Sequence, residues 1–374
     1  MAASTVSSWV PPLPESSAAA SGLVLLDRWC YIADLPNSTT AESTTSTGLV
    51  TFRAAHPPLV SHFCVHCPGL DFRSIGPKIV ATDADLVLLR VPVDPDDSAI
   101  EGSDWDYFVY RPRAQWLNLL PNPHRTRNRN LDDSATALIS REGGAWYAFG
   151  MPSLLSASSD SKGWITKRLS LDEFHRDKVI PLPRAIDDRL YHETGKTITI
   201  GGEHGTVAWV DLWRGIFFCD VLRERPRLQD VPLPEPARGN WERLLRQNDP
   251  NYVRDVTISR NNKDSIKYVE LEFLTRQQLL NATPPVSYTD WVRNNNSRKY
   301  LVIREGWKST TWNMAILVGS WEGCWHRDCV VDVKDVSLEA SDPCLSDLMA
   351  ILSSKTARTN IEGTSSSIPH PKHG

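Results

Sequence analysis

The stretch GTVAWVDLWRGIFFCDVL, residues 205–222, decides our prediction of the fold. Its two halves are short apolar runs rich in aromatic and β-branched residues, which favour strands, and the polar residues between them favour a turn. We therefore predict an antiparallel hairpin. In it Asp211 accepts hydrogen bonds from turn amides, Arg214 is its charged partner and Gly215 takes the backbone conformation of the bend, while Asp220 belongs to the same structural group.

The same stretch is also the first place to look for chemistry. Residues 209–222 hold two tryptophans, two aspartates, an arginine and a cysteine. Activity would need a base or a nucleophile that this segment lacks, whereas a turn explains each polar residue. We predict a structural role for it.

The rest of the chain repeats the strand pattern. Most apolar segments are about five to eight residues long and are separated by Gly, Pro, Asn and Asp, and helical periodicity is nearly absent. About eighteen strands can be counted this way. Residues 107–123 and 217–236 both have the form strand, loop, Leu-Pro-x-Pro, with a spacing of about two propeller blades. We predict a mostly β fold, a propeller-like array of antiparallel sheets with short helices in the connections.

Charge and cysteine content limit the partners and the compartment. The 41 basic and 45 acidic side chains leave a net charge of -4, so nucleic acid is not expected as the main partner. No apolar run is long enough for a membrane helix, so we expect a soluble protein without a membrane partner. No Lys or Arg precedes Arg28, and the seven cysteines are scattered. Both observations favour a cytoplasmic or nuclear protein with reduced thiols, not a secreted one.

Composition also divides the chain. Residues 1–21 are predicted to be a disordered leader and residues 22–336 a single β-rich, propeller-like domain. From residue 337 to 374 the sequence is rich in Ser, Thr, Pro and Lys. We predict a largely disordered tail there, with one possible short helix.

Two Cys/His groups have spacings that zinc ligands use, HFCVHC at residues 62–67 and CWHRDC at residues 324–329. The first group lies in a predicted strand, where Cys64 and Cys67 would point to opposite faces. Free cysteines are among the most buried residues, so we favour buried thiols and hydrogen-bonded histidines over a metal. The weak metal candidates are Cys64, Cys67, Cys324 and Cys329.

Motifs for catalysis and nucleotide binding are missing. The chain has no G-x-S-x-G, H-E-x-x-H, G-x-G-x-x-G or P-loop sequence, and GGEHG at residues 201–205 is better explained as a hairpin turn. We therefore expect no cofactor and no catalytic residues. The best candidates for a binding surface are two charged loops, acidic residues 94–105 and basic residues 111–129.

Several motifs resemble one family. The opening stretch, then RPRLQDVPLPEP, RDVTIS, IKYVEL and WKSTTW, are similar to the signature of the grass-expanded plant family called domain of unknown function 1618. The resemblance spans about residues 22–333, with its core at about 205–333. The family has no established activity, so the resemblance implies a plant origin and no function. The Leu-Pro pattern is also similar to F-box-associated and kelch-like propellers, which recruit partners through loops, although no helical F-box precedes it.

The leading hypothesis is a non-catalytic interaction scaffold whose protein partner is unknown. One alternative is a hydrolase-like enzyme with a site in a central channel, which needs titratable residues from several blades to converge. Another is a zinc-stabilised scaffold built on the Cys/His groups. The sequence leaves the partner and the oligomeric state open.

Overall fold

The computed structural model describes residues 24–43, 48–55, 59–68, 76–92, 105–120, 131–150, 155–159, 164–167, 169–171, 192–246, 248–259, 265–278, 301–316 and 325–335. The predicted leader, the predicted tail with its possible helix, Cys324 and nearly all of the acidic loop lie outside these residues. Among the described residues, no helix is long and apolar enough to cross a membrane.

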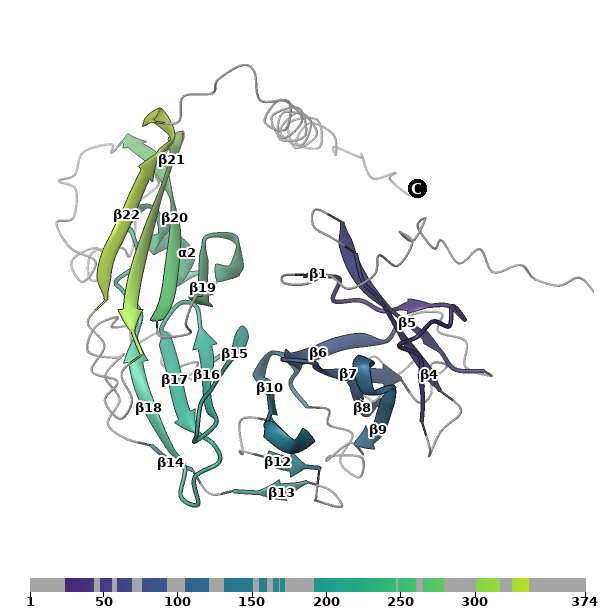
Figure 1. Cartoon of the computed structure of the whole chain (residues 1–374). Coiled ribbons are helices and arrows are strands. Elements are labelled where there is room, and N and C mark those ends of the chain that lie inside the picture. Colours follow the sequence, from purple (N-terminus) through teal and green to yellow (C-terminus); the bar gives the residue numbers. More distant parts are fainter. Residues whose placement is uncertain are drawn as a thin grey trace, which may run out of the picture.

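Five β-sheets follow one another along the chain and lie in an arc around a central space (Figure 1). The first sheet contains β1 (Leu25–Leu26), β2 (Tyr31–Ile32), β3 (Ala41–Glu42), β4 (Leu49–Arg53) and β5 (Val60–His66). The second contains β6 (Lys78–Asp83), β7 (Leu86–Pro92), β8 (Trp105–Arg111) and β9 (Trp116–Leu120). The third contains β10 (Thr136–Ser140), β11 (Trp146–Gly150), β12 (Leu155–Ser158) and β13 (Ile165–Thr166).

The fourth and fifth sheets complete the arc. The fourth contains β14 (Ser170–Leu171), β15 (Lys196–Gly201), β16 (Thr206–Asp211), β17 (Gly215–Asp220) and β18 (Arg227–Pro232). The fifth contains β19 (Arg254–Ile258), β20 (Ser265–Gln278), β21 (Leu301–Ala315) and β22 (His326–Asp332). Connections carry α2 (Trp241–Leu245) and the 3-10 turns η1 (Pro112–Ala114), η3 (Asp133–Ala135), η4 (Glu142–Gly144), η6 (Arg238–Asn240), η7 (Pro250–Tyr252) and η8 (Val333–Asp335).

The sheets are antiparallel meanders, with three exceptions. Strands β1 and β2 pair in parallel with β5, and β14 pairs in parallel with β18. The prediction of a mostly β fold of several antiparallel sheets with short helices in the connections is confirmed.

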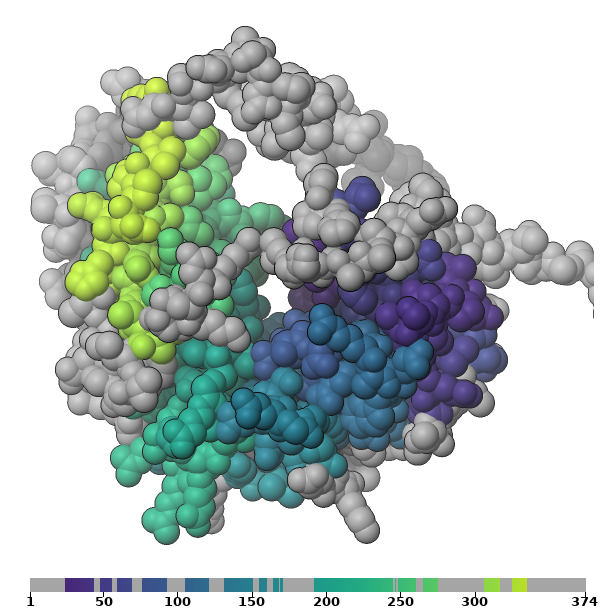
Figure 2. Space-filling model, viewed as in Figure 1, coloured from purple at the N-terminus to yellow at the C-terminus, as the bar shows by residue number. Residues whose placement is uncertain are grey.

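Each pair of neighbouring sheets shares one apolar cluster. Strand β7 shows why, because Leu86 and Leu88 pack toward the third sheet while Val87 and Leu89 pack toward the first. In the same way, alternate residues of β16 pack toward the third and the fifth sheet. Side chains alternate between the faces of a strand, so a strand covered on both faces forms a continuous apolar run. Figure 2 shows the sheets packed in chain order.

Tryptophan N–H groups add polar links between these elements. Trp209 Nε1 donates to the Ala135 carbonyl in the neighbouring third sheet at 2.9 Å, and Trp325 Nε1 donates to the Pro232 carbonyl at 2.9 Å. A buried indole is apolar apart from one N–H that needs an acceptor. The many tryptophans of this chain therefore join sheets as well as fill space.

We predicted an exposed basic loop at residues 111–129, and this prediction is wrong for residues 111–120. Residues 112–120 form η1 and β9, and Leu117 and Leu120 are buried. Arg111 is the last residue of β8 and pairs with Asp85 at 3.2 Å. The apolar residues of this segment are buried as the last strand of the second sheet. The free energy gained by burying them outweighs the tendency of the neighbouring basic residues to stay in solvent.

The inner strands of the arc come close together. Strand β10 contacts both β6 and β15, which are edge strands of the adjoining sheets. Thr197 Oγ1 donates to the Ser134 carbonyl at 2.5 Å, and Thr199 Oγ1 donates to the Leu138 carbonyl at 3.0 Å. These bonds fix the spacing of the strands that surround the candidate site.

Candidate binding cavity

A cavity of about 320 Å³ lies where the inner segments of the first four sheets meet. Its wall is formed by residues 26–28 of the first sheet, by β6, by η3 with the start of β10, and by β15. The lining is mostly polar or charged, although Leu26, Ile79 and Val80 contribute to it. A cavity of this size and polarity suits a small polar group.

A cluster of three charged residues adjoins the cavity. It consists of Lys78, Arg90 and Asp133, of which Asp133 lines the cavity. Asp133 Oδ2 accepts from Lys78 Nζ at 2.9 Å and pairs with Arg90 Nη1 at 2.9 Å. The aspartate side chain is only 8% exposed, and its Oδ1 has no hydrogen-bond partner within the described residues. The Arg90 guanidinium stacks on Trp105, 4.0 Å from the ring centre. Two cations share one carboxylate, so the cluster has a net positive charge.

The hydroxyl groups of the lining fall into two sets. Three threonine hydroxyls donate to backbone carbonyls of β10 or of the residues just before it. They belong to Thr136, Thr197 and Thr199. The hydroxyls of Thr82 and Ser134 make no hydrogen bond within the part of the chain that the structure describes. These two groups remain free to donate to a ligand.

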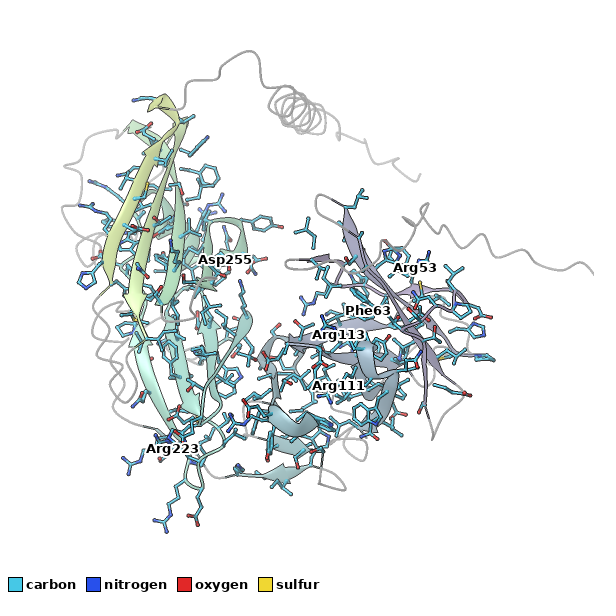
Figure 3. All side chains as sticks on the ribbon, in the orientation of Figure 1. Arg53, Phe63, Arg111, Arg113, Arg223 and Asp255 are labelled. Carbon is cyan, nitrogen blue, oxygen red and sulfur yellow. The ribbon has the colours of Figure 1, made fainter. Side chains whose placement is uncertain are left out.

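The other charged lining residues differ in how well they are paired. Asp27 accepts from Trp29 N and from the Tyr31 hydroxyl, each at 3.1 Å. Lys196 Nζ donates to Asp255 Oδ1 and to the Val256 carbonyl, each at 2.8 Å. Figure 3 labels Asp255 on the fifth sheet. Arg28 is exposed and, within the described residues, is the one charged lining residue whose side chain makes no hydrogen bond or ion pair.

Large apolar side chains are exposed on the segments that border this wall. We call them the apolar rim, which consists of Leu25, Trp29, Ile32, Leu35, Leu59 and Val60. Leu25 and Val60 are register partners in neighbouring strands, and Leu59 precedes Val60. Lys78 Nζ lies 5.4 Å from the centre of the Trp29 ring, so the rim adjoins the charged cluster. No sequence motif marked these residues, although residues 25–32 place the charged pair Asp27 and Arg28 between apolar residues.

The predicted turn residues lie in the β16–β17 hairpin. Asp211 Oδ1 accepts from Trp213 N at 3.0 Å and from Arg214 N at 3.2 Å, and its Oδ2 accepts from Glu193 N at 3.2 Å. Gly215 is the first residue of β17 and does not have a positive φ, so this turn does not need glycine's conformational freedom. Asp220, at the end of β17, accepts from Thr206 Oγ1 at 2.7 Å and from an exposed arginine side chain.

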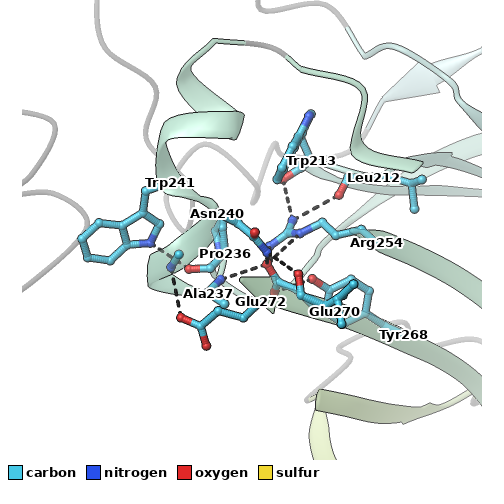
Figure 4. A network of polar contacts seen from close by, with 12 residues as sticks. Leu212, Trp213, Pro236, Ala237, Asn240, Trp241, Arg254, Tyr268, Glu270 and Glu272 are labelled. Atoms are coloured by element: carbon cyan, nitrogen blue, oxygen red, sulfur yellow. Dashed lines mark hydrogen bonds and ion pairs between the residues drawn. The ribbon is translucent and has the colours of Figure 1, made fainter. Parts of the chain in front are cut away.

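A buried ion pair binds this hairpin to the fifth sheet (Figure 4). Arg254 and Glu270 are 0% and 1% exposed, and their closest charged atoms are 3.2 Å apart. Arg254 Nη1 also donates to the carbonyls of Leu212 and Trp213 in the turn, at 3.1 and 3.3 Å. The sequence did not identify this pair, because its members and the turn are far apart along the chain.

The Glu270 carboxylate in turn organises the connection to α2. It accepts from Ala237 N at 3.0 Å, from Asn240 Nδ2 at 2.8 Å and from the Tyr268 hydroxyl at 2.8 Å. Burial and the neighbouring carboxylate raise the pKa of Tyr268, which keeps its hydroxyl protonated as a donor. Every oxygen of this carboxylate is therefore occupied.

The metal candidates are not brought together. Cys64 is buried, Cys67 is half-buried against the apolar cluster of the first two sheets, and Cys329 is exposed in β22. No group of three or more His, Cys, Asp or Glu side chains that could hold a metal is found in the described ranges. Burial also raises the pKa of the Cys64 and Cys67 thiols. A raised pKa opposes the thiolate form that zinc needs.

The comparisons with known proteins concern the second half of the chain. Residues 209–359 match the family model described as protein of unknown function (DUF1618). No curated protein matches the chain. The DUF1618 match includes Arg254 and Glu270, whereas the residues that line the cavity all precede it.

Proposed function

We propose that this chain is a non-catalytic scaffold that binds a protein partner through the apolar rim. The observation that carries the proposal is the clustering of exposed apolar side chains. The described residues expose eleven large apolar side chains, and six of them lie on the rim.

Single apolar residues on a protein surface are normal and need no explanation. A group of them on neighbouring segments marks an interaction surface more often than chance. Trp29 is 52% exposed and Leu59 is 55% exposed, so each has a large apolar area left to bury. Burial of apolar area stabilises a complex by about 25 cal/mol per Å² before the cost of association.

A hydrolytic site in the cavity is the second candidate. It is favoured by Asp27 and Asp133, which come from different sheets to one cavity. However, Asp133 holds two cations and Asp27 holds two neutral donors. Carboxylates with these contacts hold neighbouring groups in place, and they are poorly suited to act as a general acid or base.

From the resemblances described above, we also propose that this is a plant protein. We propose that it recruits its partner through loops, as F-box-associated and kelch-like propellers do. The proposed contact lies on the apolar rim of the first sheet, whereas the sequence favoured the two charged loops. Their residues 94–104 and 121–129 lie outside the described residues.

Affinity purification of the full chain, with identification of the captured proteins, tests the proposal. Leu59→Glu places a charge on the rim, and Ile165→Glu is the matched control because Ile165 is 56% exposed but lies in the third sheet. We expect a partner that the wild type and Ile165→Glu capture equally and Leu59→Glu captures at least about tenfold less. Equal capture by all three proteins would rule out the rim.

A further inference from the structure

We propose that the cavity receives an acidic side chain of the partner, so that the ligand of this chain is an apolar peptide segment carrying Asp or Glu. This inference rests on the proposed function and adds the partner's chemistry to it.

The first step is the charge that has no partner. Lys78 and Arg90 are engaged by Asp133, and Lys196 is engaged by Asp255. The Arg28 side chain has no such contact within the described residues, although its guanidinium offers five N–H donors. An Arg–carboxylate contact is charge-assisted and can be bidentate. An acidic ligand group therefore complements the lining at the one position where a described cation lacks a counter-charge.

The second step is the supply of neutral donors. The hydroxyls of Thr82 and Ser134 lie in the same lining and have no acceptor within the described part of the chain. Asp27 accepts from Trp29 N and Tyr31, Asp133 Oδ2 accepts from Lys78 and Arg90, and the unpaired Asp133 Oδ1 is itself buried. The free hydrogen-bonding capacity of the cavity is thus weighted toward donors, which favours an acceptor such as a carboxylate.

The third step is position. Arg28 lies directly between Asp27, which lines the cavity, and Trp29, which belongs to the rim. A peptide that buries apolar side chains on Trp29 and Leu25 brings its next residues to the cavity. The volume of about 320 Å³ is at the small end of ligand pockets and is ample for one acidic side chain. Apolar anchors beside one charged contact are the usual composition of an interface hot spot.

A selection from a random peptide library displayed on phage, with the full chain immobilised, tests this inference. Arg28→Glu reverses the proposed contact, and Arg113→Glu is the matched control because Arg113 is also exposed but lies on η1 (labelled in Figure 3). We expect the enriched peptides to combine apolar residues with Asp or Glu. Their affinity should fall about tenfold or more in Arg28→Glu and stay unchanged in Arg113→Glu. Replacing the acidic residue of the best peptide by its amide should cause a similar loss.

The outcomes separate this inference from the proposed function. Enriched peptides without an acidic residue, or equal binding to Arg28→Glu, would overturn the acidic ligand. If those same peptides failed to bind Leu59→Glu, the apolar rim would still be supported as the binding surface. If the selection enriched no peptide over the bare surface, the hypothesis of a peptide ligand would be wrong. The capture experiment with Leu59→Glu would still test whether the rim binds a partner. Thermal unfolding of Arg28→Glu checks that the variant is folded, which we expect because Arg28 is exposed.

Discussion

Two ionic clusters of this molecule differ in how completely their groups are paired. In the first, Arg254 and Glu270 are fully buried, and every oxygen of Glu270 accepts a hydrogen bond. In the second, Lys78 and Arg90 share one oxygen of Asp133, whose other oxygen has no partner within the described residues. The cations of the second cluster are 15% exposed, and Asp133 lines the cavity.

This difference separates a structural cluster from a candidate binding site. A buried charge is costly unless it is paired and fully hydrogen-bonded, so a complete network is the expected solution inside a core. In the second cluster the unpaired Asp133 Oδ1 is itself buried, and the contrast rests on its missing partner and on the place of Asp133 in the cavity lining. The DUF1618 match covers the complete cluster and begins after the incomplete one.

The largest expected effect is that of Glu270→Ala. The substitution leaves Arg254 as an uncompensated buried charge and removes the acceptor of Ala237 N and Asn240. We expect the free energy of unfolding to fall by about 3–5 kcal/mol. Urea unfolding followed by tryptophan fluorescence measures it.

The control for this substitution is Glu242→Ala. Glu242 pairs with Arg246 on the surface of α2, where both side chains are at least half exposed. Such a pair contributes about 0.3–0.5 kcal/mol. If Glu270→Ala cost no more than Glu242→Ala, the complete cluster would not be structural.

Asp211→Ala is expected to have the next largest effect. Asp211 accepts three backbone N–H groups, and Arg254 donates to carbonyls of the same turn. We expect a loss of about 1–3 kcal/mol through unsatisfied turn amides, with peptide binding unchanged in the folded protein. Because the turn and the ion pair share contacts, the double variant with Glu270→Ala should lose less than the sum of the two single losses. Strict additivity would show that the hairpin and the ion pair are independent.

Asp133→Asn tests the incomplete cluster directly. Lys78 and Arg90 lose their counter-charge, but each side chain is 15% exposed, and the amide oxygen of the new side chain would still accept a hydrogen bond. We therefore expect a loss of about 1–2 kcal/mol, clearly below that of Glu270→Ala. Urea unfolding measures it in the same way. A loss as large as that of Glu270→Ala would make both clusters structural and remove the contrast between them.

The sequence predicted the parts of this fold that depend on neighbouring residues. The β16–β17 hairpin and the turn that contains Gly143 and Gly144 were found because strand alternation and turn residues are local signals. The lengths of β20 and β21 were missed. These strands have 14 and 15 residues. The last four residues of β20, TRQQ, are polar, and in β21 the segment REG separates the apolar start LVI from WKSTTW.

The candidate site could not be predicted in the same way. Its lining comes from four segments between residues 26 and 199, and no single segment has a recognisable motif. Arg254 and Glu270 are 16 residues apart, and the turn carbonyls that Arg254 contacts lie about 40 residues earlier. Only the packing of sheets brings these groups together. No local pattern therefore indicates that they pair.

The smallest expected effect concerns His62, another buried polar group that is incompletely paired. His62 lies in β5, is 3% exposed, and its Nε2 has no hydrogen-bond partner within the described residues. Burial lowers the pKa of His62, an effect that the Val60 carbonyl opposes and that nearby Arg53 increases. Below about pH 6.5 the unfolded chain therefore binds a proton that the folded protein binds less readily, so stability should fall as the pH is lowered.

Urea unfolding of the wild type and of His62→Gln between about pH 8 and pH 5 measures this loss. We expect the advantage of the wild type over His62→Gln to shrink as the pH falls, because glutamine does not titrate. His326→Gln is the control, since His326 is exposed in β22. An advantage that grows at low pH would mean that His62 is protonated in the fold and paired with an acid. His62 would then belong with the complete cluster, as a buried charge paired with an acid.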